Sequence, residues 1–304
     1  MKVLVTGANG FVGRHLIDAL LAQGHEVVAA WRPGTDLPER WRRESPTLLQ
    51  TVPLELGSDG SIEDALRTGP DSIIHLAAIS YSRDAAKDPR QTWDINVGGT
   101  ERLLSAAARD SRAMTVLVAS SAEVYGGGQP RPLVETDTTR PTSVYGASKL
   151  GAEAAAAHAA AAWGLRVIVV RPFPATGPGQ TNRLIPNWLA ALRHGEREIE
   201  GDGQIVRDYL DVRDAAAAYL ALLAGGRLGE TYNIASGRGV RFDQLFSSLS
   251  AAVGTRAKLV LPSRPRQEAS HLVGDSHKLQ HHTGWKPTIP LDRTLADLID
   301  AQAH

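Results

Sequence analysis

A glycine-rich turn near the N-terminus constrains the fold of this chain more than any other feature. Residues 2–6 (KVLVT) form a short apolar run, glycines follow at Gly7, Gly10 and Gly13, and residues 12–22 carry apolar side chains at helical spacing. Glycines between a strand and a helix let the backbone turn tightly and let a pyrophosphate approach the helix's first amides without a Cβ clash. The pattern predicts dinucleotide binding, and a purely structural turn is the alternative.

Strands and helices alternate along the first half of the chain. Further strands are expected at 26–31, 52–56, 72–77, 115–120 and 166–171, and helices at 62–67, 91–109 and 145–163. Such alternation implies parallel strands joined by right-handed crossovers. The predicted fold class is therefore α/β, a Rossmann-like doubly wound parallel sheet with helices on both faces.

The alternation of strands and helices becomes irregular after Pro172, where prolines and glycines interrupt it. We therefore expect two domains. The first, residues 1–173, is a dinucleotide-binding domain to which a segment near 232–237 returns. The second, residues 174–304, is a smaller C-terminal lobe that mainly binds the substrate.

The composition and net charge exclude several classes of function. The chain has 33 Lys and Arg against 33 Asp and Glu, and this zero net charge lacks the field of a non-specific nucleic-acid or anionic-membrane binder. It has no cysteine, which excludes disulfides, thiolate metal sites and a cysteine nucleophile. The N-terminal apolar run is too short for a signal peptide, and the longest apolar stretch, 152–163, is too short to cross a bilayer. We expect a cytoplasmic protein without metal, nucleic acid or membrane as a partner.

The residues after the second expected strand bear on the choice of cofactor. An NAD site usually ends this strand in a carboxylate that binds the ribose hydroxyls, whereas this chain has Trp31 and Arg32. A guanidinium binds a 2′-phosphate in bidentate fashion, so the sequence predicts NADP(H), with Arg32 as the phosphate ligand and Arg14 as a second candidate. NAD(H), with Arg32 as a solvated loop residue, is the alternative.

Tyr145 and Lys149 lie four residues apart at the start of an expected helix, so both side chains share one face. A close ammonium stabilises a phenolate, and we expect it to lower the pKa of Tyr145 so that the phenol can act as an acid or base near neutrality. Ser120 and Ser121 end the fifth expected strand, at the edge where ligands of such sheets bind. Ser121 is the candidate to orient a substrate oxygen, and strand-end capping is the alternative, more so for Ser120.

Several motifs together resemble the extended short-chain dehydrogenase/reductases, the NAD(P)-dependent sugar-nucleotide epimerase/dehydratase family. The motifs extend over nearly the whole chain and are TGANGFVG, HLAA, SSAEVYG, YGASK, RPF, RDYLDVRD and GWKP. The resemblance implies that Tyr145 is the acid/base, that Lys149 binds the nicotinamide ribose and that Ser121 bonds the sugar oxygen. Asn96 matches a family asparagine that shapes the active site, with a structural amide as the alternative, and His75 of HLAA is interpreted as structural.

The same resemblance implies the ligand contacts. Beyond the residues already named, the expected cofactor contacts are Asn9, Phe11, Val12, Glu55, Leu56, Leu76, Ala77, Ala78 and Asn96. The substrate would be a nucleotide-diphosphate sugar, and arginines are expected to bind its phosphates through charge-assisted hydrogen bonds. The expected substrate contacts are Ser80, Ser121, Arg183, Arg207, Arg264, Arg266 and Glu268.

Within the family, the segment 171–180 (RPFPATGPGQ) and the later motifs are most similar to GDP-4-keto-6-deoxy-D-mannose reductases. That similarity implies NADPH-dependent reduction of the C4 ketone of a nucleotide-linked 4-keto-6-deoxy-hexose. A 4-epimerase or 4,6-dehydratase with tightly held NAD(P) is the alternative. Glu123 matches the glutamate that removes the C5 proton in dehydratases, so it is a catalytic candidate, and an inherited, idle residue is its other interpretation. A third hypothesis is an NADP(H)-binding sensor or scaffold without chemistry.

The run 146–164 (GASKLGAEAAAAHAAAAWG) consists almost entirely of small side chains. A helix of this composition has little polar face to offer water. It either covers its own sheet or also packs against a partner subunit, because small side chains permit close approach of helices. We expect a homodimer joined through a bundle of this helix and the helix of residues 91–109.

Overall fold

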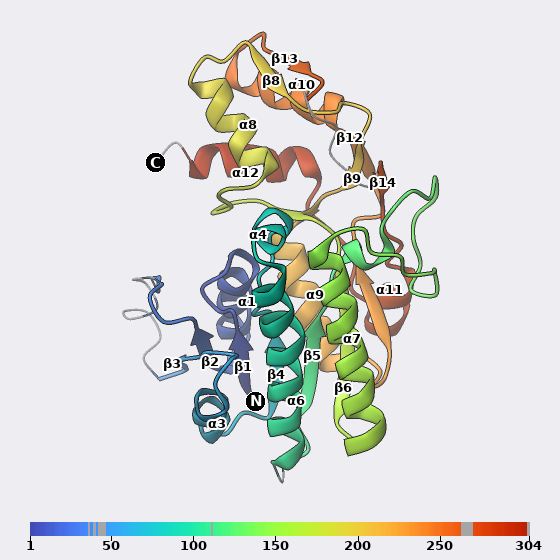
Figure 1. Cartoon of the computed structure of the whole chain (residues 1–304). Helices are drawn as coiled ribbons and strands as arrows, with labels where there is room; N and C mark the ends of the chain where they lie inside the picture. Colours follow the sequence, from blue (N-terminus) through green and yellow to red (C-terminus); the bar gives the residue numbers. More distant parts are fainter. Residues whose placement is uncertain (36, 39–40, 42–46, 111, 263–269, 303–304) are drawn as a thin grey trace.

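The computed structural model describes residues 1–35, 37–38, 41, 47–110, 112–262 and 270–302. Its centre is a seven-stranded sheet of order β11-β6-β5-β4-β1-β2-β3, in which every neighbouring pair runs parallel (Figure 1). The strands are β1 Lys2–Thr6, β2 Glu26–Trp31, β3 Leu49–Pro53, β4 Ser72–His75, β5 Thr115–Ala119, β6 Arg166–Pro172 and β11 Thr231–Ile234. The predicted doubly wound α/β fold is confirmed.

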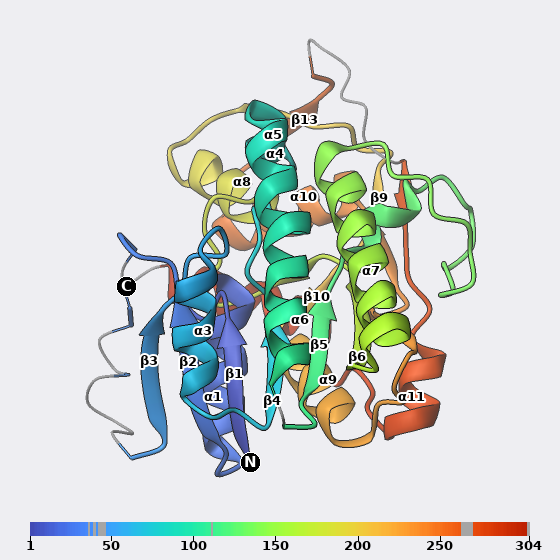
Figure 2. The same ribbon diagram turned by 60° about the horizontal axis from the view of Figure 1, so that its bottom comes forward.

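Helices cover both faces of the sheet. One face carries α1 Phe11–Ala22, α9 Val212–Gly225 and α11 His277–Thr283. The other carries α3 Asp59–Arg67, α6 Gly99–Arg109 and α7 Val144–Trp163, which lie in front of the sheet in Figure 2. Strand β1 shows the division, because Val3 and Val5 belong to the core under α1 and Leu4 to the opposite core. Burial on both faces explains why the central strands are apolar throughout.

Two expected elements differ from the structure. The single helix expected over 91–109 is three consecutive elements, α5 Pro89–Trp93, the π-helix η1 Asp94–Gly98 and α6. The expected strand 52–56 is β3, which begins at Leu49 and ends at Pro53. β3 lies at the sheet edge with only Val52 buried. Its other residues are therefore not selected to be apolar, and the sequence does not show where the strand begins and ends. The other predicted elements agree within three residues.

A second lobe lies above the sheet in Figure 1. Its helices and strands are α8 Leu184–Arg193, α10 Phe242–Val253, α12 Leu291–Ala301, β8 Glu198–Glu200, β9 Val206–Asp208, β12 Gly239–Arg241, β13 Lys258–Val260 and β14 His271–Leu272. In its core the Trp188 ring meets Phe242 and Phe246 edge-on at 5.5 and 5.4 Å. The connecting elements are α4 Ser82–Lys87, the 3₁₀-helix η2 Ala122–Tyr125, β7 Ala175–Thr176 and β10 Leu210–Asp211.

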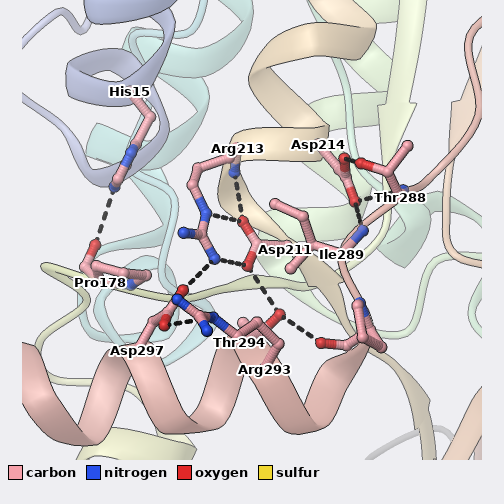
Figure 3. Close-up of polar contacts among 11 residues, drawn as sticks. His15, Pro178, Asp211, Arg213, Asp214, Thr288, Ile289, Arg293, Thr294 and Asp297 are labelled. Atoms are coloured by element: carbon pink, nitrogen blue, oxygen red, sulfur yellow. Dashed lines mark hydrogen bonds and ion pairs between the residues drawn. The ribbon is translucent and has the colours of Figure 1, made fainter.

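Two aspartates in the first turn of α9 fasten the C-terminal segment to the sheet domain (Figure 3). Asp211 accepts hydrogen bonds from Arg213 at 2.7 and 2.9 Å, and Arg213 also pairs with Asp297 of α12 at 2.7 Å. Asp214 accepts backbone hydrogen bonds from residues 288–289 at 2.9 and 2.8 Å. These contacts hold α12 beside α9 and so set the second lobe over the sheet. Within the described ranges, no helix is long and apolar enough to cross a membrane.

Candidate active site

The loop between β1 and α1 brings its glycines against neighbouring backbone. A Cβ on Gly13 would lie 2.4 Å from the carbonyl oxygen of Gly7, and a Cβ on Gly7 would lie 2.8 Å from the amide nitrogen of Ala77, in the loop after β4. Gly7 also has a φ of +68°, which disfavours any side chain there. Gly10 precedes α1 and has no side chain to occupy the helix's first amides. The result is a cradle without side chains, where the strand order reverses, that fits the pyrophosphate of a dinucleotide.

Asn96 ties this region together from the π-helix η1. Its buried amide bonds both backbone groups of Ile79, at 2.8 and 3.1 Å, and donates to the Ser148 hydroxyl on α7 at 2.9 Å. The Thr100 hydroxyl donates to the Asn96 carbonyl at 2.6 Å within the widened turn. π-turns are frequent at functional sites because they turn a side chain inward. Asn96 thus positions the loop after β4, which carries Leu76, Ala77 and Ala78.

His75 lies fully buried at the end of β4, between the hydroxyls of Thr6 at 2.7 Å and Thr100 at 3.0 Å. Burial, with a further contribution from Lys149, lowers the pKa of His75 to about 3. The imidazole is therefore neutral near pH 7 and links strand β1 to helix α6. This agrees with its interpretation as a structural residue.

The start of α7 and the end of β5 bring the three expected catalytic residues together. Tyr145 and Lys149 lie in the first turns of α7, whose N-terminus is capped by the Ser143 hydroxyl. They are 9% and 3% exposed. Ser121 follows β5, accepts a hydrogen bond from the Glu123 amide at 3.1 Å, and acts to lower the pKa of Tyr145. The Lys149 Nζ donates to the carbonyl of Ala119 at 2.6 Å.

The expected effect of Lys149 on the phenol is wrong for this structure. Burial raises the pKa of Tyr145 well above its usual value, and the Glu123 carboxylate raises it further. The cation that acts on the phenol in the opposite direction is Arg183, not Lys149, whose ammonium is engaged by the Ala119 carbonyl. Tyr145 is therefore protonated near neutral pH, as a proton donor must be.

Glu123, in η2, accepts one serine hydroxyl on each of its carboxylate oxygens. The Ser82 hydroxyl at the start of α4 donates to Oε1 at 2.7 Å, and the Ser143 hydroxyl donates to Oε2 at 2.6 Å. Glu123 thereby joins three segments around Tyr145, namely α4, η2 and the N-terminus of α7. Sequence analysis did not find the two serines, because their spacing from Glu123 follows no periodic pattern.

Arg183 reaches from the second lobe to the first. It is the residue before α8, and its guanidinium carbon lies 4.3 Å from the centre of the Tyr81 ring in the loop before α4. The neighbouring Ser80 is exposed. A second contact between the lobes joins His15 Nε2 of α1 to the carbonyl oxygen of Pro178, which lies 2.9 Å away (Figure 3). Both contacts connect a loop of the second lobe to the sheet domain.

The remaining substrate candidates lie in the second lobe. Arg207 is in β9, is 9% exposed, and holds its guanidinium 5.7 Å from the Phe242 ring centre. Arg264, Arg266 and Glu268 fall outside the described residues.

A chain of hydrogen bonds connects the glycine loop to the end of β2. Arg14 Nε donates to the Asn9 carbonyl at 2.9 Å, the Asn9 amide donates to the Thr35 hydroxyl at 2.6 Å, and that hydroxyl donates to the Arg32 carbonyl at 2.5 Å. Arg14 and Arg32 are both exposed. The structure thus brings together two arginines that the sequence names as phosphate candidates. Phe11 and Val12 begin α1 beside them, and Glu55 and Leu56 follow β3.

Residues 3–235 match the NAD dependent epimerase/dehydratase family, and this match covers most of the chain. The chain belongs to this family. Among curated proteins, this epimerase/dehydratase family member is 34% identical to GDP-6-deoxy-D-mannose reductase of Pseudomonas aeruginosa, over 98% of this chain and 96% of the relative. It is also 29% identical to UDP-glucose 4-epimerase of Halalkalibacterium halodurans, over 98% and 94%.

Solved structures of the family have the same fold. RMD from Pseudomonas aeruginosa complexed with NADPH aligns with a TM-score of 0.83 at 31% identity, over 99% of this chain and 98% of that one. DesIV, a dTDP-glucose 4,6-dehydratase from Streptomyces venezuelae with NAD bound, aligns with a TM-score of 0.91 at 28% identity, over 100% and 97%. This family member is thus an extended short-chain dehydrogenase/reductase, an NAD(P)-dependent oxidoreductase by family.

Proposed function

We propose that this enzyme uses NADPH to reduce the C4 ketone of a nucleotide-linked 4-keto-6-deoxy-hexose. The observation that carries the proposal is the cluster of Ser121, Tyr145 and Lys149 beside the glycine cradle, with a phenol that is protonated near neutral pH. The 34% identity to GDP-6-deoxy-D-mannose reductase supports the substrate class. A nicotinamide, when bound, would supply the hydride.

The chain's own residues would then bind the ketone and move one proton. Ser121 is placed to donate a hydrogen bond to the C4 oxygen, and Tyr145 to give its proton to that oxygen as negative charge develops there. The phenol starts in the protonated state that reduction requires, because its ordinary pKa is already near 10 and burial raises it further. Lys149 would bind the ribose hydroxyls of the nicotinamide.

Glu123 accepts one serine hydroxyl on each carboxylate oxygen, at 2.7 and 2.6 Å. Each oxygen keeps a second lone pair, so these contacts leave a dehydratase base as the alternative, and the proposal of a reductase rests on the 34% identity to GDP-6-deoxy-D-mannose reductase. We propose that Glu123 holds Ser82 and Ser143 in place around Tyr145. A 4-epimerase is the second candidate function, since the chain is 29% identical to a UDP-glucose 4-epimerase over 98% of its length.

We propose NADP(H) as the cofactor. The exposed Arg14 and Arg32 are linked through Asn9 and Thr35 at the end of β2, where a 2′-phosphate would lie. Two guanidinium groups suit a phosphate that carries about two negative charges. The NADPH complex of RMD is consistent with this choice, and the NAD complex of DesIV keeps NAD(H) as the alternative.

We propose that the substrate lies between the two lobes, with its diphosphate on arginines of the second lobe. Arg183 and Arg207 are the described candidates, and Arg264, Arg266 and Glu268 remain candidates from the sequence. We keep the division into residues 1–173 and 174–304, with α9, β11 and α11 assigned to the sheet domain because they pack on or in the sheet.

A substrate panel tests the proposed reaction. The protein and NADPH are incubated with GDP-, dTDP-, UDP- and CDP-linked 4-keto-6-deoxy sugars, and the absorbance of the reduced nicotinamide is followed. We expect one sugar nucleotide to be reduced with one NADPH consumed per molecule. Tyr145→Phe is the control for contaminating reductases. Interconversion of 4-hydroxy sugar nucleotides without consumption of added NADPH would support the epimerase instead.

We further propose a homodimer joined through α7 and the segment of residues 91–109. These helices lie side by side in Figure 2, and α7 exposes alanines together with Trp163, which is 38% exposed. Trp93 is 44% exposed and lies 3.0 Å from the position of a Cβ on Gly151 of α7. Light scattering at micromolar concentration should give twice the mass of one chain, and Ala157→Arg should lower it. A monomeric wild-type protein would refute the dimer.

The cytoplasmic location stays a prediction.

A further inference from the structure

A buried ion pair lies directly behind the reaction site. Arg171 of β6 donates from Nε and Nη2 to the two oxygens of Glu153 on α7, at 2.8 and 2.7 Å. The two side chains are 8% and 11% exposed. The Ser120 hydroxyl donates to the same carboxylate. Bidentate pairing and a third donor hold the Glu153 carboxylate in one orientation.

Arg171 is itself fixed on its other side. Its Nη1 donates to the Tyr125 hydroxyl at 3.0 Å and to the Glu135 carbonyl at 3.1 Å. Its guanidinium carbon lies 4.9 Å from the Tyr125 ring centre, within cation–π range. The Tyr125 hydroxyl in turn donates to Asn233 of β11 at 2.7 Å. The charge of Glu153 is therefore held by a network that spans β6, η2 and β11.

Glu153 and Lys149 hold the same stretch of backbone. Glu153 follows Lys149 by one helical turn, so both side chains lie on the α7 face that packs on β5. Lys149 donates to the Ala119 carbonyl, and Glu153 accepts from the hydroxyl of the next residue, Ser120. The residue after that is Ser121. A shift of the Glu153 carboxylate would thus move the residues beside both Lys149 and Ser121.

The pKa of the buried Lys149 ammonium depends on the charge of Glu153. Burial lowers the pKa of Lys149 to about 8, and the Glu153 carboxylate acts in the opposite direction. From β4, the neighbouring His75 is neutral, and from β6, Arg171 is paired with Glu153. From α7 itself, the Tyr145 phenol is protonated. Among the described residues, the only carboxylate found to act on the Lys149 ammonium is that of Glu153.

We propose that Glu153 is a positioning residue of the active site, which keeps the Lys149 ammonium charged and fixes the end of β5, while Arg171 holds its carboxylate in place. The inference rests on the role proposed for Lys149 toward the nicotinamide ribose. It assigns a function to a pair that would otherwise only stabilise the fold. The electrostatic part of this role can be measured, because removing the charge of Glu153 should change the pH at which Lys149 loses its proton.

The test is the pH dependence of NADPH binding, followed by nicotinamide fluorescence from pH 6 to 10. In the wild type, affinity should fall above a midpoint near pH 8, because Lys149 loses its proton there. Glu153→Gln keeps the size of the side chain and removes its charge, so the midpoint should move down by about one pH unit. Glu153→Asp keeps the charge and should keep the midpoint, whatever its effect on overall affinity.

A midpoint that Glu153→Gln leaves in place, or that Glu153→Asp lowers equally, would overturn the proposal. Because Glu153→Gln leaves Arg171 as an unpaired cation that itself disfavours the Lys149 ammonium, the double variant with Arg171→Gln is measured as well, and its midpoint should lie between those of the wild type and Glu153→Gln. The readout needs no sugar substrate. If the 4-ketoreductase proposal fails, no sugar nucleotide oxidises NADPH while the binding titration still reports on Glu153.

Discussion

The glycine cradle and the contact between the two lobes are built in different ways. In the cradle, backbone packs on backbone, so that a Cβ on Gly7 or Gly13 would lie within 2.8 Å of a main-chain atom. At the contact between the lobes, side chains from separate segments meet, as when Arg183 of the second lobe stacks on Tyr81 of the first. The glycine cradle has no room for an added atom, whereas a side chain at the contact between the lobes can be replaced by another without moving the sheet.

This difference has a consequence for specificity. Relatives named as a reductase, an epimerase and a dehydratase align over nearly the whole chain. The backbone cradle of this chain fits a pyrophosphate, which is common to NAD and NADP. We infer that substrate choice lies in side chains at the contact between the lobes, and substitutions in the two regions should therefore have separable effects.

The largest effect is expected at Tyr145, where the two regions meet. Tyr145→Phe removes the proton donor and should lower kcat about a thousandfold, while NADPH affinity changes less than about twofold. Stopped-flow rates and fluorescence titration measure the two quantities. The matched control is Tyr81→Phe, which keeps the ring beneath Arg183 and should keep kcat. A Tyr145→Phe enzyme with near-normal kcat would show that another group donates the proton.

The next effect tests the backbone cradle. Gly13→Ala places a Cβ against the Gly7 carbonyl, so NADPH binding should weaken about a hundredfold, together with a lower Tm. Calorimetric titration and thermal unfolding measure both. Gly60→Ala is the control, because a Cβ on Gly60 in α3 has no atom within 4 Å and should stabilise the helix by up to about 1 kcal/mol. Equal NADPH affinities in the two variants would contradict the cradle.

A smaller effect is expected at the contact between the lobes. Arg183→Ala should raise the KM for the sugar nucleotide about tenfold, because a charge-assisted phosphate contact is lost, and should leave NADPH affinity unchanged. Arg183→Lys keeps the charge and should recover part of the loss. Initial rates over a range of sugar-nucleotide concentrations give the KM. If Arg183→Ala weakens NADPH binding instead, the two regions are not separable at this residue.

The smallest effect is expected at the proposed 2′-phosphate site, where arginine side chains rather than backbone atoms would contact the cofactor. Arg32→Ala should narrow the preference for NADPH over NADH by roughly fivefold, since Arg14 remains to bind the 2′-phosphate. Competition titrations with both cofactors measure the ratio. The exposed Arg67 of α3 is the control position, and Arg67→Ala should not change the ratio. Equal affinities of the wild type for NADPH and NADH would refute the phosphate site.

Part of the structure could be predicted from the sequence, and part could not. The helix expected over 91–109 became three elements because the Asn96 amide is held by Ile79 and Ser148, which no local pattern reveals. The phenol of Tyr145 was expected to be acidified by its neighbour one turn away, yet burial and the Ala119 carbonyl decide otherwise. Glu153 follows Lys149 by four residues in the sequence, but its partner Arg171 lies on strand β6, which sequence spacing does not relate to α7.

The sequence by itself determined the parallel sheet, the glycine cradle and the presence of Ser121, Tyr145 and Lys149 at its edge. Strand and helix periodicity is local, and glycine spacing records where backbone must pass close to backbone. Only the tertiary structure decided which charge faces which group, because burial and contacts between distant segments set those energies. For that reason Arg183, Glu123 and Glu153 acquire their places around the phenol and the ammonium only once the two lobes and the sheet are assembled.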